Sequence, residues 1–550
     1  MITGFKIGDF LPGFLSRERS IAGKGFNRWM VPPAALCIHL CIGMAYGFSV
    51  FWLPLTRAIG ITQQKPYPAD LTFLQKLCNT TFDWDKPMLG WMYTLFFVFL
   101  GSSAAFFGPW LERAGPRKAG FISTLCWCGG LVISALGIYV HQLWIIWLGA
   151  GVIGGIGLGL GYISPVSTLI KWFPDKRGMA TGMAIMGFGG GAMIGSPLAD
   201  NLMKYFATPD SVGVWQAFLV LAGIYFAFMM VGTFAYRVPP EGWKPDNWVP
   251  KDNASSMIAR GYITVDVAWR TRQFWLLWMI LCLNVSAGIG VIGMASPMLQ
   301  EIFGGRLLGL PISFEQLDKD QLGKIAAMAA GFTGLLSLFN IGGRFFWSSL
   351  SDRLGRKITF YLFFILGFVL YALVPLSGKV ASVAFFVFLF CLILTMYGGG
   401  FATIPAYLAD LFGTKMVGAI HGRLLTAWSV AGILGPVLVN YVNEAQIAAG
   451  TPKSQAYDVT MFILAGLLLG GMVCNFLVKP LPEKCFRHDE SISSIPQLQN
   501  TSVSSLGSDA CQVVGTKTPA FMVALFWLLV GLPLLWGTWQ TLVLAVKFFQ

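Results

Sequence analysis

Long apolar stretches alternate with short polar segments along almost the whole chain. A helix that crosses a membrane needs about 20 consecutive, mostly apolar residues. Thirteen stretches approach or exceed this length, and they fall into a group of six, a second group of six and a last stretch: 30–56, 88–110, 119–140, 143–170, 178–200 and 214–236; then 273–302, 323–348, 358–377, 380–410, 415–441 and 457–479; and finally 519–546. The pattern predicts an all-α membrane protein.

Polar segments between and around these groups predict the domain organisation. A segment rich in Ser and Gln and poor in apolar residues is typical of a disordered tail. The expected order is a cytoplasmic N-terminal tail over 1–29, an N-terminal six-helix bundle over 30–236, a cytoplasmic linker over 237–272, a C-terminal six-helix bundle over 273–479, a cytoplasmic flexible tail over 480–518 and an additional transmembrane segment over 519–546.

Composition and charge support this interpretation. Of 550 residues, 55% are hydrophobic and 11% are charged, whereas ordinary soluble chains have about 25% charged residues. The net charge is +13, and most of the 38 Lys and Arg lie in segments on the same side as the N-terminus. Basic loops face the cytoplasm. We therefore expect a multi-pass protein of the inner (cytoplasmic) membrane with its N-terminus inside. Its surroundings are the lipid bilayer, and we do not expect it to bind nucleic acid.

Cofactor and metal sites are not expected. Gly149, Gly151 and Gly154 match the spacing of a dinucleotide fingerprint, but that fingerprint must follow a strand. Here the glycines lie inside an apolar stretch and predict a close helix-packing face. The chain has four His and ten Cys, and their spacing does not resemble a metal site.

An internal repeat relates the two groups of helices. The segment Gly108-Pro-Trp-Leu-Glu-Arg-Ala-Gly-Pro-Arg-Lys118 follows the second stretch, and Ser348-Ser-Leu-Ser-Asp-Arg-Leu-Gly-Arg-Lys357 follows the eighth. Arg113 then corresponds to Arg353, and Gly115 to Gly355. Parallel six-helix halves are a transporter architecture, in which the substrate binds between the halves near the membrane midplane.

The paired loops resemble the signature of the major facilitator superfamily. The resemblance extends over about residues 25–480, and the last stretch lies outside it. In that family the loop acid and Arg help to hold the cytoplasmic gate, which implies this role for Glu112, Arg113, Asp352 and Arg353. The alternative is that these charges only anchor short loops at the lipid surface.

Further segments resemble the oxalate/formate antiporter branch of this superfamily, which includes monocarboxylate carriers. They are Lys171-Trp-Phe-Pro-Asp-Lys-Arg-Gly-Met-Ala-Thr-Gly182, Asp410-Leu-Phe-Gly-Thr-Lys415 and Gly422-Arg-Leu-Leu-Thr-Ala-Trp428. Carriers of this branch bind the substrate carboxylate with an Arg of the eighth helix, which implies this role for Arg344.

Arg344 is also singled out by its depth. It precedes Asp352 by eight residues, which places it about 12 Å inside the membrane at 1.5 Å per residue. No Asp or Glu lies at a similar depth to neutralise it. A guanidinium grips a carboxylate with two hydrogen bonds, and Asn340, one turn away on the same face, is expected to assist. Snorkelling to the cytoplasm is the alternative for Arg344, and it is the favoured interpretation for the shallower Arg423.

Other polar side chains are candidates for binding and coupling. His39 lies near mid-depth and has a near-neutral reference pKa, so it is a proton-coupling candidate; the alternative is a structural hydrogen bond. Four aromatic side chains fall on helices that line the cavity in this family and are expected to bind substrate: Tyr46, Tyr162, Tyr397 and Trp428. Trp428 occupies the neighbourhood where the oxalate exchangers carry a Lys, which favours a monoanion.

The expected function is secondary active transport of a small organic anion, such as lactate, pyruvate, formate or an oxalate-like anion. Alternating access would operate as proton symport or anion exchange, and protons are the second candidate partner. We expect a monomer that is not an enzyme, since no nucleophile–base pair lies at depth. Two alternatives remain open: a membrane carboxylate sensor without net transport, and an exporter of unrelated compounds such as drugs or sugars.

Overall fold

The computed structural model describes residues 13–60, 65–68, 70–246, 248, 258–259, 261–487 and 517–549. Within these ranges the chain forms helices and no β-strand. Thirteen helical segments are long and apolar enough to cross a membrane. The protein is thus an all-α, multi-pass membrane protein, as the hydrophobic pattern predicts.

The first six spans are built from continuous and interrupted helices. The first span joins α1 to a 3-10 stretch and a short helix, and the fourth joins a short helix and a π-helical stretch to α7. The bounds are α1 (Val31–Ile42), the 3-10 stretch (Gly43–Phe51), α2 (Trp52–Leu55), α4 (Lys86–Ala114), α5 (Pro116–Tyr139), α6 (Leu143–Ile146), the π-helical stretch (Trp147–Gly154), α7 (Gly155–Trp172), α8 (Arg177–Phe206) and α9 (Val214–Ala235). A small helix, α3 (Phe73–Leu77), lies in the loop before α4.

The next six spans repeat this order, followed by one additional helix. The eleventh span is divided at Leu425 into two helices. The bounds are α11 (Arg272–Phe303), α12 (Lys319–Leu354), α13 (Arg356–Lys379), α14 (Val383–Phe412), α15 (Val417–Leu424), α16 (Thr426–Ala448), α17 (Asp458–Leu477) and α18 (Ala520–Phe549). The linker contains α10 (Val265–Ala268).

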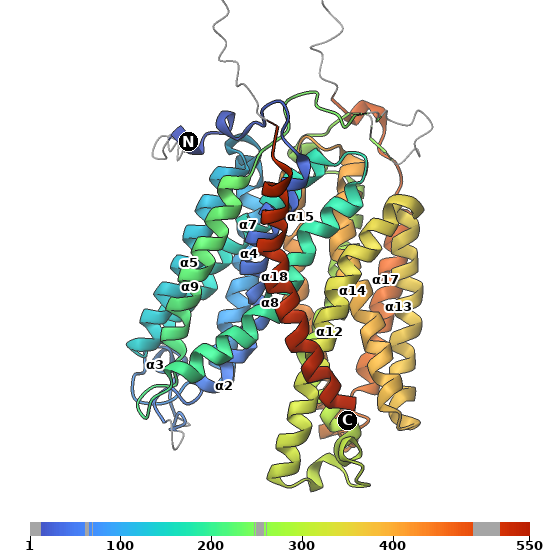
Figure 1. Cartoon of the computed structure of the whole chain (residues 1–550). Coiled ribbons are helices and arrows are strands. Elements are labelled where there is room, and N and C mark those ends of the chain that lie inside the picture. The colour runs from blue at the N-terminus through green and yellow to red at the C-terminus, as the bar shows by residue number, and fades with distance from the viewer. Residues whose placement is uncertain are drawn as a thin grey trace, which may run out of the picture.

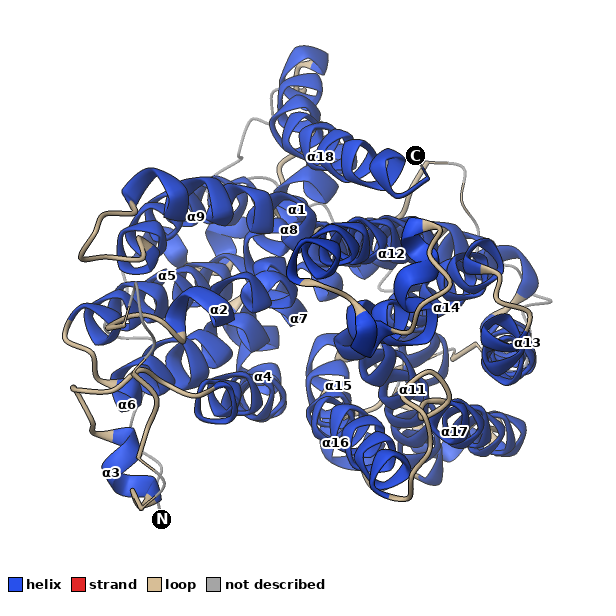
Figure 2. Cartoon of the chain, turned by 90° about the horizontal axis from the view of Figure 1, so that it is seen from below, coloured by secondary structure: helices blue, strands red, loops and turns tan. Residues whose placement is uncertain are grey.

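Two helical bundles lie side by side, with α18 outside both. Figure 2 shows α1 to α9 on one side and α11 to α17 on the other. Close helix pairs join the bundles, α4 with α15 and α16, and α8 with α12. Helix α18 packs against α8 of the first bundle and α12 of the second, and many of its other side chains are exposed, as expected for contact with lipid.

The repeated loops have the same backbone geometry. Helix α4 ends at Gly115 with φ 86°, and α12 ends at Gly355 with φ 87°. Such a φ is strained for a residue with a side chain, so glycine permits the sharp turn into the next helix. The two repeated loops therefore share the same kind of turn.

The predicted tails lie partly outside the described residues. Of the flexible tail predicted over 480–518, residues 488–516 are outside them, as are residues 1–12 of the N-terminal tail. The described start of the C-terminal tail is ordered against the linker, since the backbones of Tyr262 and Arg487 exchange two hydrogen bonds of 3.1 and 2.9 Å.

Candidate functional site

The Arg344 side chain lies buried where the two bundles meet. Its Nε donates to Asn340 Oδ1 at 3.1 Å, one turn away on α12. Its Nη1 donates to the carbonyl oxygen of Ile185, in α8 of the other bundle, at 3.1 Å. The residue is 0% exposed. The guanidinium therefore connects the bundles and does not snorkel to the membrane surface.

Small residues provide the room for this side chain. A Cβ atom on Gly189 of α8 would lie 3.1 Å from Arg344 Nε, and one on Gly398 of α14 would lie 3.0 Å from Arg344 Cγ. A larger residue at either position would displace the guanidinium. The glycine-rich sequences of α8 and α14 thus form the walls of the site.

No carboxylate neutralises Arg344 among the residues that the structure describes. Its Nη2 atom is buried and has no hydrogen-bond partner. A buried charge without a counter-ion costs several kcal/mol, and a buried donor left unpaired costs about 1–3 kcal/mol. This atom is therefore a donor available to an anion.

Aromatic rings enclose the guanidinium. Its central carbon lies 5.8 Å from the centroid of the Phe188 ring and 5.7 Å from that of Phe401. Trp428 packs against both rings, at centroid distances of 5.4 and 4.7 Å, and also against Tyr162 at 5.3 Å. The indole Nε1 of Trp428 and the hydroxyl of Tyr162 are buried and without a partner, so they are two further donors in the same cluster.

Two more phenols meet beside the guanidinium. Tyr46, from the 3-10 stretch of the first span, and Tyr397, from α14, place their hydroxyl oxygens 3.1 Å apart. The Tyr46 ring also packs on Phe188, with centroids 5.0 Å apart. Of the residues predicted to bind substrate, the structure thus brings together Arg344 and Asn340 as one pair, Tyr46 and Tyr397 as another, and Tyr162 and Trp428 in the aromatic cluster.

His39 is held by the backbone within the first bundle. Its Nδ1 contacts the carbonyl oxygen of Ala184, and its Nε2 lies 3.2 Å from that of Tyr162. The residue is 0% exposed. The second histidine at this level is His421 of α15, whose ring lies 5.9 Å from that of Tyr162 on the far side of the bundle contact. Its Nδ1 is buried and without a partner.

Ion pairs and hydrogen bonds close one end of the bundle contact, here called the terminal face, which is the end that carries Gly13–Met30 at the top of Figure 1. Glu112 of α4 accepts from the backbone N–H of Gly418 at 3.0 Å, across the bundle contact. Lys171 and Ser167 of α7 also donate to this carboxylate, at 2.5 and 3.1 Å. Glu112 thus fixes the start of α15 against the first bundle.

The second repeated loop closes the same face from the other side. Asp352 accepts from the backbone N–H groups of Gly178 and Met179 at 2.8 and 2.9 Å, at the N-terminus of α8. A carboxylate at this position is stabilised by the partial positive charge of the helix end. Asp410 pairs with Arg177 of the first bundle at 2.8 Å and with Arg356 of the second at 3.0 Å.

The motif arginines do not contribute to these contacts. Arg113 and Arg353 are exposed, and the described part of the chain gives neither an ion pair. Arg423 lies away from the site, where it pairs with Asp266 of α10 at 2.9 Å. The cations at the gate are Lys171, Arg177 and Arg356.

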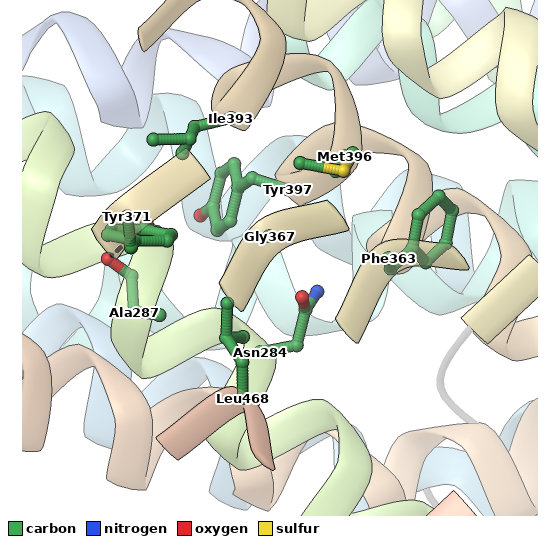
Figure 3. Close-up of a pocket in the computed structure, with 10 residues that line it drawn as sticks. Asn284, Ala287, Phe363, Gly367, Tyr371, Ile393, Met396, Tyr397 and Leu468 are labelled. Atoms are coloured by element: carbon green, nitrogen blue, oxygen red, sulfur yellow. Dashed lines mark hydrogen bonds between the residues drawn. The ribbon is translucent and has the colours of Figure 1, made fainter. Parts of the chain in front are cut away.

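A small pocket lies beside the site, within the second bundle. Figure 3 shows Tyr397 and Asn284 among its lining residues, with Tyr371 donating to the Ala287 carbonyl oxygen at 2.9 Å. Arg344 does not line this pocket. Tyr397 therefore stands between the pocket and the Tyr46 hydroxyl.

Sequence reasoning missed several residues of the site and the gate. Phe188, Phe401 and His421 lie inside apolar helices, and Arg177 and Arg356 lie at helix starts. For Arg177 the signal was present, since it belongs to the Lys171–Gly182 segment that marked the family branch. No group of three or more His, Cys, Asp or Glu suited to a metal occurs among the described residues.

Comparison with known proteins decides the family. Two matches, over residues 35–436 and 317–550, are to the family described as Major Facilitator Superfamily. The chain belongs to the Major Facilitator Superfamily.

Relatives and solved structures agree with this assignment. The chain is 27% identical over 468 residues to the oxalate:formate antiporter of Oxalobacter formigenes, which covers 83% of this chain and 96% of that protein. It is 26% identical over 385 residues to apicoplast pyruvate carrier 1 of Toxoplasma gondii, which covers 61% of this chain and 65% of that protein. A proton:xylose symporter structure of this superfamily shares the fold, with a TM-score of 0.59, 12% identity and coverage of 82% and 96% of the two chains.

Proposed function

We propose that this chain is a secondary transporter that carries small monocarboxylates across the cytoplasmic membrane by alternating access. The observation that carries the proposal is Arg344, a buried guanidinium at the contact between the bundles with its Nη2 unpaired and no described carboxylate against it. A substrate carboxylate would supply the missing anion. It would accept from Nη2 and restore the charge balance of the site.

The surroundings favour an anion with a small apolar group. Two buried atoms of the aromatic cluster, the Tyr162 hydroxyl and Trp428 Nε1, lack partners and can donate to an anion. The walls are the rings of Phe188 and Phe401. Donors suit a carboxylate, and aromatic faces suit a short acyl chain. A single permanent cation favours one negative charge over two.

The gate geometry fits one state of an alternating-access cycle. The terminal face is closed by Glu112, Asp352 and Asp410, each of which accepts from the opposite bundle. We infer that this face is cytoplasmic, since the basic N-terminal segment lies there. Breaking these contacts would open the site to the cytoplasm.

The relatives support the same substrate class. They include an oxalate:formate antiporter and a pyruvate carrier, and both names denote carboxylate substrates. An exchanger of dianions is expected to carry a second cation, and this chain has Trp428 in that neighbourhood. This favours monocarboxylates, such as pyruvate, lactate and formate, over dianions as substrates.

Uptake into proteoliposomes tests this proposal. Vesicles that contain the purified protein should accumulate labelled pyruvate, lactate or formate, and unlabelled monocarboxylates should compete while xylose and tetraphenylphosphonium should not. Saturable binding of these acids without uptake would contradict transport and would indicate a sensor. Uptake that only sugars or hydrophobic cations inhibit would contradict the carboxylate assignment.

A further inference from the structure

His421 is a buried titratable group that the carboxylate site does not use. It is 1% exposed, and its Nδ1 has no hydrogen-bond partner. Its ring faces Tyr162, whose hydroxyl is also unpaired. An unpaired imidazole nitrogen beside an unpaired hydroxyl, both in an apolar interior, is costly for stability and points to a group that exchanges a proton.

The two histidines differ in their freedom to do this. Both ring nitrogens of His39 lie against backbone carbonyl oxygens of the first bundle, Ala184 and Tyr162, and α1 packs on α7 and α8 of that same bundle. His421 belongs to the second bundle, and its ring meets Tyr162 of the first across the bundle contact. Opening the contact would expose His421 and leave His39 enclosed.

His421 also stands next to the gate. It follows Gly418 by three residues on α15, about 4.5 Å along the helix axis. Gly418 is the residue whose N–H binds Glu112. When this bond breaks and α15 leaves α4 and α7, His421 is among the first groups that water reaches. On its inner side, Tyr162 connects it to Trp428 and Phe188 of the anion site.

Other ionisable groups around α15 are already engaged or lie further out. Helices α4, α7, α10, α11, α14 and α16 pack against α15, and α1 packs against α7, which carries Tyr162. The ionisable side chains on these helices include His39, Glu112, Tyr162, Lys171, Asp266, Tyr407 and Asp410. Glu112 and Lys171 pair with each other, Asp266 pairs with Arg423, and Asp410 pairs with two arginines. His39 and Tyr162 are the groups that act on His421 directly.

We propose that His421 Nδ1 is the proton-binding site that couples monocarboxylate movement to protons, an inference that rests on the proposed function. With the terminal face closed, a hydronium ion that enters with the carboxylate from the opposite side gives its proton to the Nδ1 lone pair. One O–H bond of hydronium breaks and one N–H bond of His421 forms as the carboxylate binds Arg344. When the terminal face opens, this N–H bond breaks and the proton passes to water with release of the carboxylate. One proton thus accompanies each anion.

The bound anion determines when His421 can carry a charge. The empty site carries one positive charge, on Arg344. A carboxylate alone reduces it to zero, and a carboxylate with protonated His421 restores it to one. A second cation in the same poorly solvated interior without the anion would cost more, since like charges repel strongly there. The loaded and empty carriers then present the same charge to the membrane.

Two assays on His421→Gln and His39→Gln test the inference, with labelled pyruvate, lactate and formate as probes. The first assay is accumulation driven by an inward proton gradient, and the second is counterflow of labelled against unlabelled acid at equal pH. Wild-type protein should accumulate label several-fold above the level without a gradient. His421→Gln should lose this stimulation, to about onefold, and keep counterflow, while His39→Gln should keep both.

The outcomes separate this inference from the proposed function. The proton assignment would be overturned if His421→Gln accumulated label under the gradient at the wild-type level. It would also be overturned if the wild-type protein showed counterflow but no response to the gradient. Loss of counterflow in a His421→Gln protein that elutes as a monodisperse species would overturn it too, because His421 would then serve the anion site. Absence of counterflow in wild-type protein would instead contradict carboxylate transport itself.

Discussion

Tyr46 and Tyr397 join the two bundles through their hydroxyl groups, 3.1 Å apart, beside the Arg344 guanidinium. One phenol comes from the first span and the other from the tenth, 351 residues later. In a hydroxyl pair only one member needs to donate to the other, so one proton remains for a substrate oxygen.

Replacing either phenol by phenylalanine should weaken substrate binding. We expect Tyr46→Phe and Tyr397→Phe to raise the KM for monocarboxylate uptake about tenfold, because a hydrogen bond to a charged group contributes about 1.5–3 kcal/mol. Proteoliposome uptake against substrate concentration measures this. Tyr407→Phe, on the same helix as Tyr397 and with a buried, unpaired hydroxyl, is the matched control and should behave like wild type. An unchanged KM in both site variants would remove the phenols from the binding site.

Asp410 should control the closed state of the terminal face. Asp410→Asn removes the charge that holds Arg177 at 2.8 Å and Arg356 at 3.0 Å, so the bundles should separate there. Spin labels on Arg113 and Arg353, which are exposed and lie on opposite bundles, report this separation by electron–electron distance measurement. We expect the distance distribution to shift to longer values.

Asp200→Asn is the control for this experiment. Asp200 pairs with Lys204 at 2.6 Å near the opposite end of α8 from Arg177, and the Asp200 side chain is 45% exposed. Exposed pairs contribute little to stability, so its distance distribution should match the wild type. The role of Asp410 as a gate residue would be refuted by an equal distribution in all three proteins.

Gly182 should be intolerant of a side chain in the closed state. Its Cβ position falls onto Ser348 Oγ of the other bundle and lies 2.9 Å from the Arg344 carbonyl oxygen. Gly182→Ala should therefore push α8 and α12 apart and slow uptake several-fold. Gly223→Ala, where a Cβ would meet no atom within 4 Å, should transport at the wild-type rate. Equal rates for the two variants would show that the seam is looser than the structure indicates.

Helix α18 should stabilise the transporter without being required for substrate binding. It packs on α8 and α12 and contributes no residue to the cluster around Arg344. Its Gly537 lies close to the backbone of Met193 in α8. We expect truncation after Thr518 to lower the melting temperature in detergent and to preserve saturable uptake. A truncated protein with unchanged melting and no uptake would instead assign α18 a direct role in transport.

The sequence predicts the architecture because its signals are local. Apolar length defines each span, and the repeated loops at Gly115 and Gly355 indicate a duplication; both glycines have the positive φ that a sharp turn requires. The pairing of Arg344 with Asn340 is also local, since residues four apart share a helix face, and the predicted neighbours are hydrogen-bonded.

Contacts between the bundles could not be predicted in the same way. The Ile185 carbonyl that binds Arg344 is 159 residues away in the chain, and its position depends on the register of α8 against α12. The contact of His421 with Tyr162 likewise joins residues that are far apart in the chain, so it depends on how the two bundles pack. The loop motif pointed to Arg113 and Arg353, which are exposed in the last turns of α4 and α12. The ion pairs form instead with Arg177, which reaches Asp410 of the opposite bundle, and with Arg356, which pairs with Asp352 and Asp410 of its own bundle.

Uptake by Arg344→Lys tests the central claim most directly. Lysine keeps the charge but cannot present the planar pair of donors, so initial uptake of the best monocarboxylate should fall at least tenfold at subsaturating concentration. Arg423→Lys, whose partner is Asp266 on the surface, is the matched control and should retain the wild-type rate. Undiminished uptake by a correctly folded Arg344→Lys protein would contradict the assignment of Arg344 as the carboxylate receptor.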